Sequence, residues 1–128
     1  MVGMFFLMAH SFNDMMNPRP FYSDFPNAIR ILESRMQWAE TSDGLYVFIT
    51  GVVTNESSAA WRNVEFDTRF YDSNGRLIDA VEGYGGSFTV LPDNDAAFRV
   101  STRPLLSSNN YSSFKISVSN ARTARGPF

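Results

Sequence analysis

Residues 45–79, LYVFITGVVTNESSAAWRNVEFDTRFYDSNGRLID, decide the fold. In the second half of this stretch, every other residue would point to the same face of an extended chain. These residues are Val64, Phe66, Thr68 and Phe70. The residues between them are charged, and strict alternation is typical of a strand with one buried and one wet face. Asn74-Gly75 then predicts a hairpin turn, because both residue types tolerate a positive φ. Residues 77–81 are expected to return as the partner strand.

The first half of the stretch predicts a central strand. Residues 45–54 are rich in β-branched and aromatic side chains, which favour strands. Gly51 interrupts them, and a glycine inside a strand usually marks a bulge or the close approach of a backbone or a large ring. The preceding residues 29–40 fit one face of a helix as well as a strand. Asp43-Gly44 favours the strand, because it predicts a hairpin turn into the next one.

The rest of the chain adds further short strands. Alternating runs at residues 88–90, 98–102 and 114–118 bring the total to about seven strands at near-regular spacing, a pattern typical of antiparallel sandwiches. We therefore expect an all-β chain with three parts. Residues 1–28 form an extended apolar and aromatic arm, residues 29–121 the β-sandwich, and residues 122–128 a short basic tail.

Several turn and core positions between residues 45 and 120 form a recurring pattern. They are Ile49, Gly51, Val53 and Asn55, then Asn63-Val64, Phe70-Tyr71-Asp72, Asn74-Gly75, Leu91-Pro92-Asp93-Asn94, Ala97-Phe98 and Val100. The pattern resembles the FxLYD family, and Tyr71-Asp72 fits the name of that family. Phe70 and Thr68 depart from it, standing where the family has Leu and Phe. The resemblance implies an immunoglobulin-like sandwich of a bacterial or archaeal surface or secreted protein.

Composition limits the classes of function. The chain has 128 residues, of which 44% are hydrophobic and 15% aromatic, so it suits one domain with a real core rather than a disordered chain. The net charge is −2 and no basic stripe is present, which argues against nucleic-acid binding. With no cysteine, the sequence has neither a disulfide frame nor a cysteine metal site.

No group of residues predicts a reaction. His10 is the only histidine and lies beside an apolar segment, a poor place for a catalytic base. Asp72-x-Asn74-Gly75 lacks the spacing of a calcium loop, whereas calcium binding by Asp93 and Asp95 stays open. Asn55-Glu56-Ser57 and Asn110-Tyr111-Ser112 match the glycosylation sequon. We expect a protein that is not an enzyme and has no cofactor and no catalytic or metal site.

Residues 1–9, MVGMFFLMA, are apolar but too short to span a bilayer, which takes about 20 residues. Three interpretations stay open: the end of a signal anchor, a plug that docks on a partner or dips into the membrane interface, or a first strand of the domain itself. Because flexible methionines suit adaptable contacts, we expect the arm to dock on a partner. The predicted docking residues are Met4, Phe5, Phe6, Leu7, Met8, Phe12, Met15, Met16, Phe21, Tyr22 and Phe25.

These expectations lead to two hypotheses of function. The first is a non-catalytic accessory subunit outside the cytoplasm, peripheral to or anchored at the membrane. Its arm docks to the protein subunits of a larger membrane-associated complex, for which a respiratory or photosynthetic host is an option. The alternative is a soluble module of the FxLYD type that binds a protein or an envelope component through loops or an edge strand.

Overall fold

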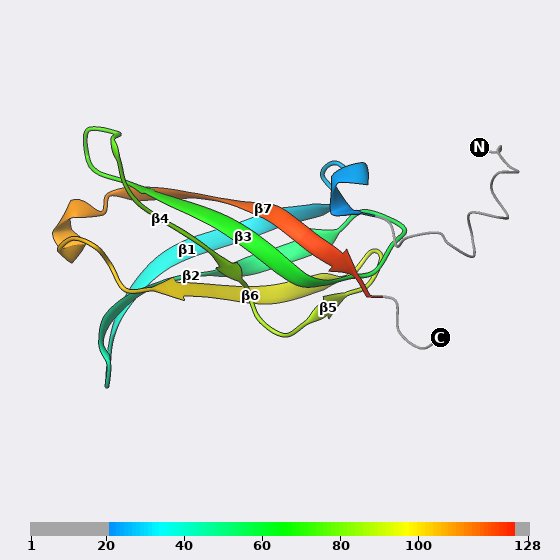
Figure 1. The fold of residues 1–128 in the computed structure, drawn as a ribbon, viewed down its shortest axis with the longest axis horizontal. Helices are drawn as coiled ribbons and strands as arrows, with labels where there is room; N and C mark the ends of the chain where they lie inside the picture. The colour runs from blue at the N-terminus through cyan, green and yellow to red at the C-terminus, as the bar shows by residue number, and fades with distance from the viewer. Residues whose placement is uncertain (1–20, 125–128) are drawn as a thin grey trace, which may run out of the picture.

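Strand β3, Trp61–Tyr71, is the centre of the fold (Figure 1). The computed structural model describes residues 21–124. As predicted, the alternation in β3 turns one side into the core, where Val64, Phe66 and Thr68 are 0% exposed and Phe70 is 1% exposed. The other elements are η1 (Tyr22–Asp24), β1 (Ile29–Thr41), β2 (Gly44–Asn55), β4 (Leu77–Tyr84), β5 (Thr89–Val90), β6 (Asp95–Thr102), η2 (Ser108–Asn110) and β7 (Ser113–Thr123).

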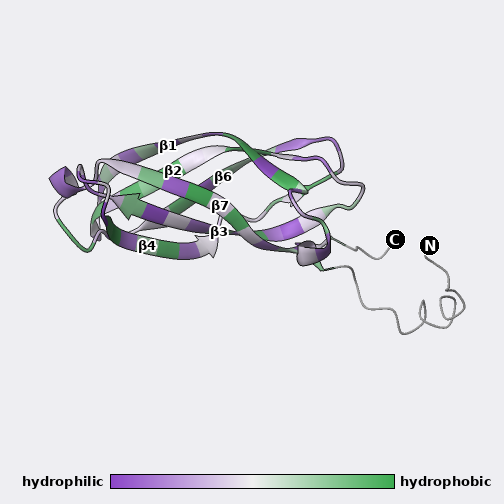
Figure 2. Cartoon of the chain, turned by 90° about the horizontal axis from the view of Figure 1, so that it is seen from above, coloured by the Kyte–Doolittle hydropathy of each residue, from purple (hydrophilic) through white to green (hydrophobic). Residues whose placement is uncertain are grey.

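The strands form the predicted antiparallel sandwich. One sheet has the order β1-β2-β6, so β2 is a central strand, as predicted from residues 45–54. In the other sheet, β3 pairs with β4 and β5 along one edge and with β7 along the opposite edge. Figure 2 shows hydrophobic and hydrophilic residues alternating along β3 and β7, as expected for strands with one face toward a core.

The hairpin at Asp43-Gly44 is confirmed and settles the ambiguous segment before it. Gly44 has a φ of 113°, and β1 and β2 pair from Ile29 with Asn55 to Thr41 with Gly44. Residues 29–40 are therefore strand and not helix. The hairpin partner offers a long row of backbone hydrogen bonds, and that row outweighs the helical spacing of the apolar residues.

The turn between β3 and β4 differs in detail from the prediction. Gly75 has a φ of 79°, but Asn74 is not among the residues with positive φ. Gly75 donates its N–H to the Asp72 carbonyl at 2.9 Å, and the Asp72 carboxylate accepts the N–H groups of Asn74 and Arg76, both at 2.9 Å. The Asp72 side chain therefore organises the turn, and only one residue needs the left-handed region.

The close approach predicted at Gly51 is present. A Cβ atom at this position would overlap the carbonyl oxygen of Glu33 and lie 2.8 Å from the Phe98 ring. Opposite this region β1 carries a bulge, because the pairing steps from Ile31 directly to Glu33 and leaves Leu32 extra. Gly51 thus lets the distorted edge strand and an aromatic ring of β6 approach the same backbone.

The first described residues lie against the sandwich. The rings of Tyr22 and Phe25 meet the ring of Trp61 edge-on, at centroid distances of 5.2 and 5.3 Å. The Tyr22 hydroxyl accepts the N–H of Ile29 at 3.2 Å. Ala28 is 4% exposed and belongs to the core. Part of the expected arm, from Tyr22 onward, is therefore packed on the body, whereas residues 1–20 and the end of the tail lie outside the described residues.

Candidate functional site

An open groove runs along the side of the sandwich where β1 and β7, one edge strand from each sheet, lie near each other. Two hollows form it, and Ile31, Ile116 and Ser117 line both. The larger hollow has a volume of about 820 Å³ and extends to Phe114. The smaller one has a volume of about 300 Å³ and extends to Tyr22. We call this groove the β1–β7 seam.

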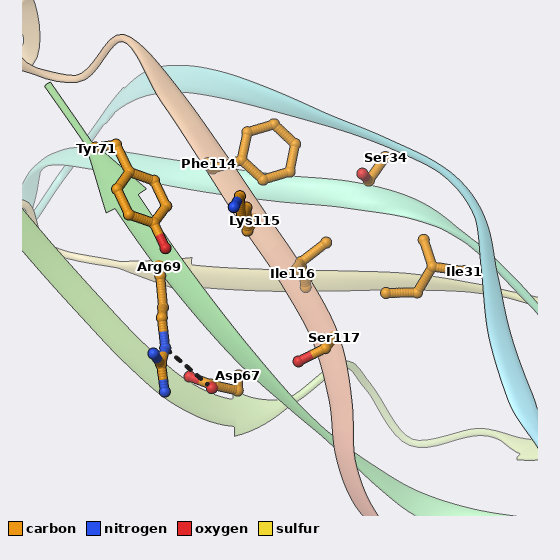
Figure 3. Close-up of a pocket in the computed structure, with 9 residues that line it drawn as sticks. All are labelled: Ile31, Ser34, Asp67, Arg69, Tyr71, Phe114, Lys115, Ile116 and Ser117. Carbon is orange, nitrogen blue, oxygen red and sulfur yellow. Dashed lines mark ion pairs between the residues drawn. The ribbon is translucent and has the colours of Figure 1, made fainter. Parts of the chain in front are cut away.

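The seam has an apolar side and a polar side, and β7 runs between them (Figure 3). Ile31, Phe114 and Ile116 are half-buried and lie toward β1. On the other side of β7, Arg69 and Asp67 form an ion pair at 3.3 Å, which Figure 3 marks with a dashed line. An extended segment laid along the open edge of β7 would meet apolar side chains on one face and Lys115 and Ser117 on the other, whereas Asp67 and Arg69 lie across β7, on β3.

The edge of β7 that faces the seam has no strand partner among the described residues. Ser113–Val118 pairs with Tyr71–Phe66 of β3 in unbroken register, and β7 pairs with no other strand there. Its outer backbone N–H and C=O groups are therefore available to a further strand. Lys115 is the only charged residue in this stretch. A regular edge with little charge is the kind that accepts an added strand.

The other edges of the sandwich are better protected against strand addition. β1 carries the bulge at Leu32, followed by the exposed charges of Glu33 and Arg35. β6 carries Asp95 and Arg99, both exposed. The edge on the far side of β3 is divided between β4, with 8 residues, and β5, with 2. Bulges, charges and short strands are the features that block edge pairing in natural sheets, so the Ser113–Val118 edge of β7, before its own register shift near Ser119, is the least protected.

The docking residues predicted from the sequence are placed only in part. Met4, Phe5, Phe6, Leu7, Met8, Phe12, Met15 and Met16 lie outside the described residues. Phe21 is 63% exposed, whereas Tyr22 and Phe25 are partly buried against Trp61 of the same chain. The structure thus brings Tyr22 and Phe25 together in one aromatic cluster and leaves Phe21 outside it. Docking of these three rings on a partner stays a prediction.

Sequence reasoning missed the seam. The alternation of Phe114, Ile116 and Val118 predicts a last strand, which is β7, but all three side chains are only half-buried. Alternation predicts which side chains point inward. It does not predict whether a strand lies at an edge or whether the opposite sheet covers it. Only the position of β7 beside the charged and bulged β1 turns these apolar residues into a groove lining.

The first glycosylation sequon, Asn55-Glu56-Ser57, forms a buried hydrogen-bond network and is not accessible to a glycan. Asn55 is 0% exposed, and its side-chain amide donates to the carbonyls of Ala59 at 2.6 Å and Val90 at 3.0 Å. Its side-chain oxygen accepts the N–H of Ser57 at 2.9 Å and the Ser57 hydroxyl at 2.8 Å. The Ser57 hydroxyl in turn accepts the indole N–H of Trp61 at 2.9 Å. A glycan on Asn55 is therefore incompatible with the fold, whereas Asn110 of the second sequon is exposed.

A second buried network holds the loop before β7. The Tyr111 hydroxyl donates to the Asp79 carboxylate at 2.6 Å and accepts the N–H of Leu105 at 3.0 Å. Asp79 is 8% exposed and also accepts the N–H of Leu105, at 3.2 Å. Burial raises the pKa of the Tyr111 phenol, and its hydrogen bond to Asp79 raises that pKa further. These groups bond to one another and to backbone, so the network fixes the loop and leaves no reactive group open.

Metal binding at Asp93 and Asp95 gains no support from the geometry. Asp93 occupies a tight turn with a φ of 64°, and its N–H donates to the Asn55 carbonyl at 2.9 Å. Within residues 21–124, no three His, Cys, Asp or Glu side chains gather in a way that could hold an ion. Across the same residues, no helix has the length and apolar character needed to cross a membrane.

No protein-family model matches the chain, and no curated protein is similar to it in sequence. Three solved structures are similar in fold. A DUF1425 family member from Shewanella sp. pv-4 has a TM-score of 0.46 and 15% identity over 71% of this chain and 76% of that one. The Northeast Structural Genomics Consortium target SoR45 has a TM-score of 0.42 and 21% identity over 59% and 61%. Campylobacter jejuni cj0090 has a TM-score of 0.40 and 15% identity over 75% and 90%.

Proposed function

We propose that this protein is a non-catalytic binding module that takes an extended segment of another protein into the β1–β7 seam as an added strand. One observation carries the proposal: the Ser113–Val118 part of β7 presents a regular edge with one charged residue directly beside a half-buried apolar lining. Main-chain hydrogen bonds to β7 would supply affinity, and the hollows around Phe114 and Ile116 would select the side chains of the segment.

The chemistry of the seam describes its ligand. The apolar residues Ile31, Phe114 and Ile116 suit aliphatic or aromatic side chains at every second position of the segment. On the outer face of β7, Lys115 and Ser117 suit hydroxyl or charged side chains at the positions between. We therefore infer an alternating segment, apolar on one face and polar on the other.

We further propose that the module is of the FxLYD type and works outside the cytoplasm, as an accessory part of a larger membrane-associated assembly. The support for this setting is the resemblance at Asn55, Tyr71-Asp72 and Asn74-Gly75, together with the apolar residues 1–9. Attachment to such an assembly through the arm is a separate proposal that rests on the sequence alone.

The seam can be tested with a synthetic ten-residue peptide in which Val and Phe alternate with Thr and Lys. We expect saturable NMR shift changes in the isotopically labelled full chain, concentrated on Ser113–Val118 and Ile31. Ile116→Asp should weaken binding by about tenfold or more, which corresponds to ~1.4 kcal/mol, because it places a charge in the apolar lining. Ile116→Thr is the milder variant if the first is poorly folded.

Ile78→Asp is the matched control, since Ile78 is a half-buried isoleucine of β4, on the other side of β3. It should leave the affinity for the peptide within about twofold of the natural chain, a free-energy difference near 0.4 kcal/mol. Shift changes concentrated on the edge of β6, or the absence of binding in every form of the chain, would contradict the proposed function.

A further inference from the structure

We propose that residues 4–9 of the same chain, Met4-Phe5-Phe6-Leu7-Met8-Ala9, occupy the β1–β7 seam as a strand beside β7 until a partner segment displaces them. The inference rests on the proposed function, since it requires the seam to accept a strand. It adds a regulatory feature: the protein covers its own binding site.

The chain leaves the described body at the right place for this. Tyr22 lines the hollow at the end of the seam where β7 passes Val118, and Figure 1 shows η1 beside the end of β7. Residues 10–20 separate the proposed strand from this point, and a chain of that length spans at most ~36 Å. The six residues Ser113–Val118 extend over ~20 Å. Residues 4–9 therefore reach the whole regular edge without passing around the sandwich.

The chemistry of the segment matches the lining. All six residues are apolar and none is charged, and the larger hollow, of about 820 Å³, offers Ile31, Phe114 and Ile116. Unbranched methionine side chains fill irregular gaps well. Left in water, the same run would form an exposed apolar patch of the kind that causes aggregation. Burial in the seam removes apolar surface from water on both the segment and the groove.

The tether decides which copy of the segment binds. A short covalent link keeps the segment at a local concentration on the order of millimolar, above the concentration of a second copy of the chain in ordinary solutions. In the proposed arrangement Ala9 lies at the Val118 end of the seam, nearest to Tyr22, so the added strand is parallel to β7. A parallel pair is somewhat less stable per residue than an antiparallel one, which leaves the segment displaceable.

The first test compares peptide affinity in two forms of the full chain. The double variant Phe5→Asp with Phe6→Asp changes two neighbouring residues. Because neighbours in a strand point to opposite faces, one of the two charges must fall on the face that is buried in the seam. We expect this variant to bind the alternating peptide at least about tenfold more tightly than the natural chain, because the apparent Kd scales inversely with the open fraction of the site.

The control is Leu105→Asp with Leu106→Asp, which places two charges on exposed leucines of a loop, 75% and 45% accessible, outside the seam. It should leave the peptide affinity unchanged. Equal affinity in the natural chain and the arm variant would overturn the inference while leaving the proposed function intact. Failure of both forms to bind the peptide would instead overturn the proposed function.

The second test uses the absence of cysteine from the chain. Ala9→Cys or Met8→Cys, each combined with Ser117→Cys, should form an intramolecular disulfide under mild oxidation, seen as a monomer on a non-reducing gel. Two arm positions are needed because neighbouring residues of a strand point to opposite faces. Ser101→Cys on β6, also exposed, replaces Ser117→Cys in the control.

Each outcome of the second test has one meaning. A disulfide within the monomer at Ser117→Cys, but not at Ser101→Cys, supports the inference. A dimer linked through Ser117→Cys would show that a second copy supplies the strand, which overturns occupation by the same chain. Equal linking at both positions, or at neither, would also overturn it.

Discussion

Two buried polar side chains, those of Asn55 and Thr68, differ sharply in how many hydrogen-bond partners the fold gives them. Asn55 and Thr68 are both 0% exposed. Every polar group of the Asn55 side chain has a hydrogen-bond partner within the network of Ser57, Ala59 and Val90. The Thr68 hydroxyl, in contrast, has no partner among the described residues. The first residue should therefore be hard to replace and the second easy to improve.

Asn55→Ala should destabilise the fold by about 3 kcal/mol, because it removes the amide donor to the Ala59 and Val90 carbonyls and the acceptor of the Ser57 N–H and hydroxyl groups. Urea unfolding followed by circular dichroism measures the loss. Asn110→Ala is the matched control, since Asn110 is exposed and should cost at most about 0.5 kcal/mol. Comparable losses in the two variants would contradict the role assigned to Asn55.

Thr68→Val should raise the free energy of unfolding by about 1 kcal/mol, because Val has nearly the same shape and removes a hydroxyl that is buried without a partner. The unfolding midpoint should rise while the urea m-value stays constant. Thr50→Val, at a half-buried strand position, is the control and should be nearly neutral. A loss of stability in Thr68→Val would mean that its hydroxyl is in fact satisfied.

At single residues, the sequence predicted whether a side chain lies in the core better than it predicted what that side chain does there. The alternation around Thr68 correctly placed it in the core, and the resemblance included Asn55 among its core and turn positions. The sequence also matched Asn55 to a sequon, and nothing local distinguished the two interpretations. Its partner Val90 is 35 positions away. Hydrogen bonds between such distant segments depend on how the sheets meet, which no short motif encodes.

At the scale of elements, the loop from Leu105 to Ser112 depends on one side chain. Tyr111 meets the rings of Trp38 and Phe70 edge-on, at centroid distances of 5.1 and 5.3 Å. Its hydroxyl lies between the Asp79 carboxylate and the backbone of Leu105. The backbone of this loop is thus held by buried hydrogen bonds, although Leu105 is 75% exposed.

Tyr111→Phe should destabilise the fold by about 2 kcal/mol, since it removes a hydrogen bond to a buried carboxylate and keeps the ring. Amide exchange at Leu105 and Leu106 should accelerate by about tenfold or more as the loop opens locally. Tyr84→Phe, at a tyrosine that is 60% exposed, is the control. Unchanged exchange at both leucine amides would contradict this role.

The same variant should change the stability above pH 10. The pKa of Tyr111 is raised in the folded state, first by burial and then by Asp79. Its contribution to stability is therefore complete below the unfolded pKa, about 10, and is lost as pH rises through the higher folded value. Unfolding titrations from pH 8 upward should decline less steeply in Tyr111→Phe than in the natural chain. Tyr22, whose pKa burial also raises, accounts for part of the slope that remains.

The elements themselves were largely predictable. The alternation of apolar and polar residues predicted the strands, and the turn residues predicted both hairpins. The β-branched and aromatic content of residues 45–54 predicted the central position of β2. The seam did not, because its residues Phe114 and Ile116 obey the same alternation as a fully covered strand. An edge is a property of sheet order, and sheet order depends on crossover connections rather than on local pattern.

At the scale of the molecule, one core joins both sheets. The stacked rings of Phe66 from β3 and Phe98 from β6, with centroids 4.4 Å apart, connect the sheets near their middle. The two tryptophans of the chain lie at different ends: Trp61 pairs with Thr123 at the end of β7, whereas Trp38 packs on Tyr111 before β7 begins. They are therefore independent probes of one folding unit.

Single-tryptophan variants should unfold as one unit. We expect Trp38→Phe and Trp61→Phe each to show, in urea, a fluorescence midpoint equal to the midpoint of its own circular dichroism signal. Trp61→Phe should be the less stable variant, by about 1–2 kcal/mol, because it removes a fully buried indole and its bond to Ser57. An earlier fluorescence transition in Trp38→Phe would show that the end with η1 unfolds separately.

The burial of Asn55 has a consequence for making the protein in a cell. A eukaryotic secretory host attaches sugar to a sequon while the emerging chain is still extended, before β2 and β5 have met around that amide. A chain that acquires an oligosaccharide there loses the bonds to Ala59 and Val90 and cannot close its core. Folding and modification would thus compete for one nitrogen atom, and secretion from yeast or insect cells should give a misfolded glycosylated fraction that bacterial expression lacks.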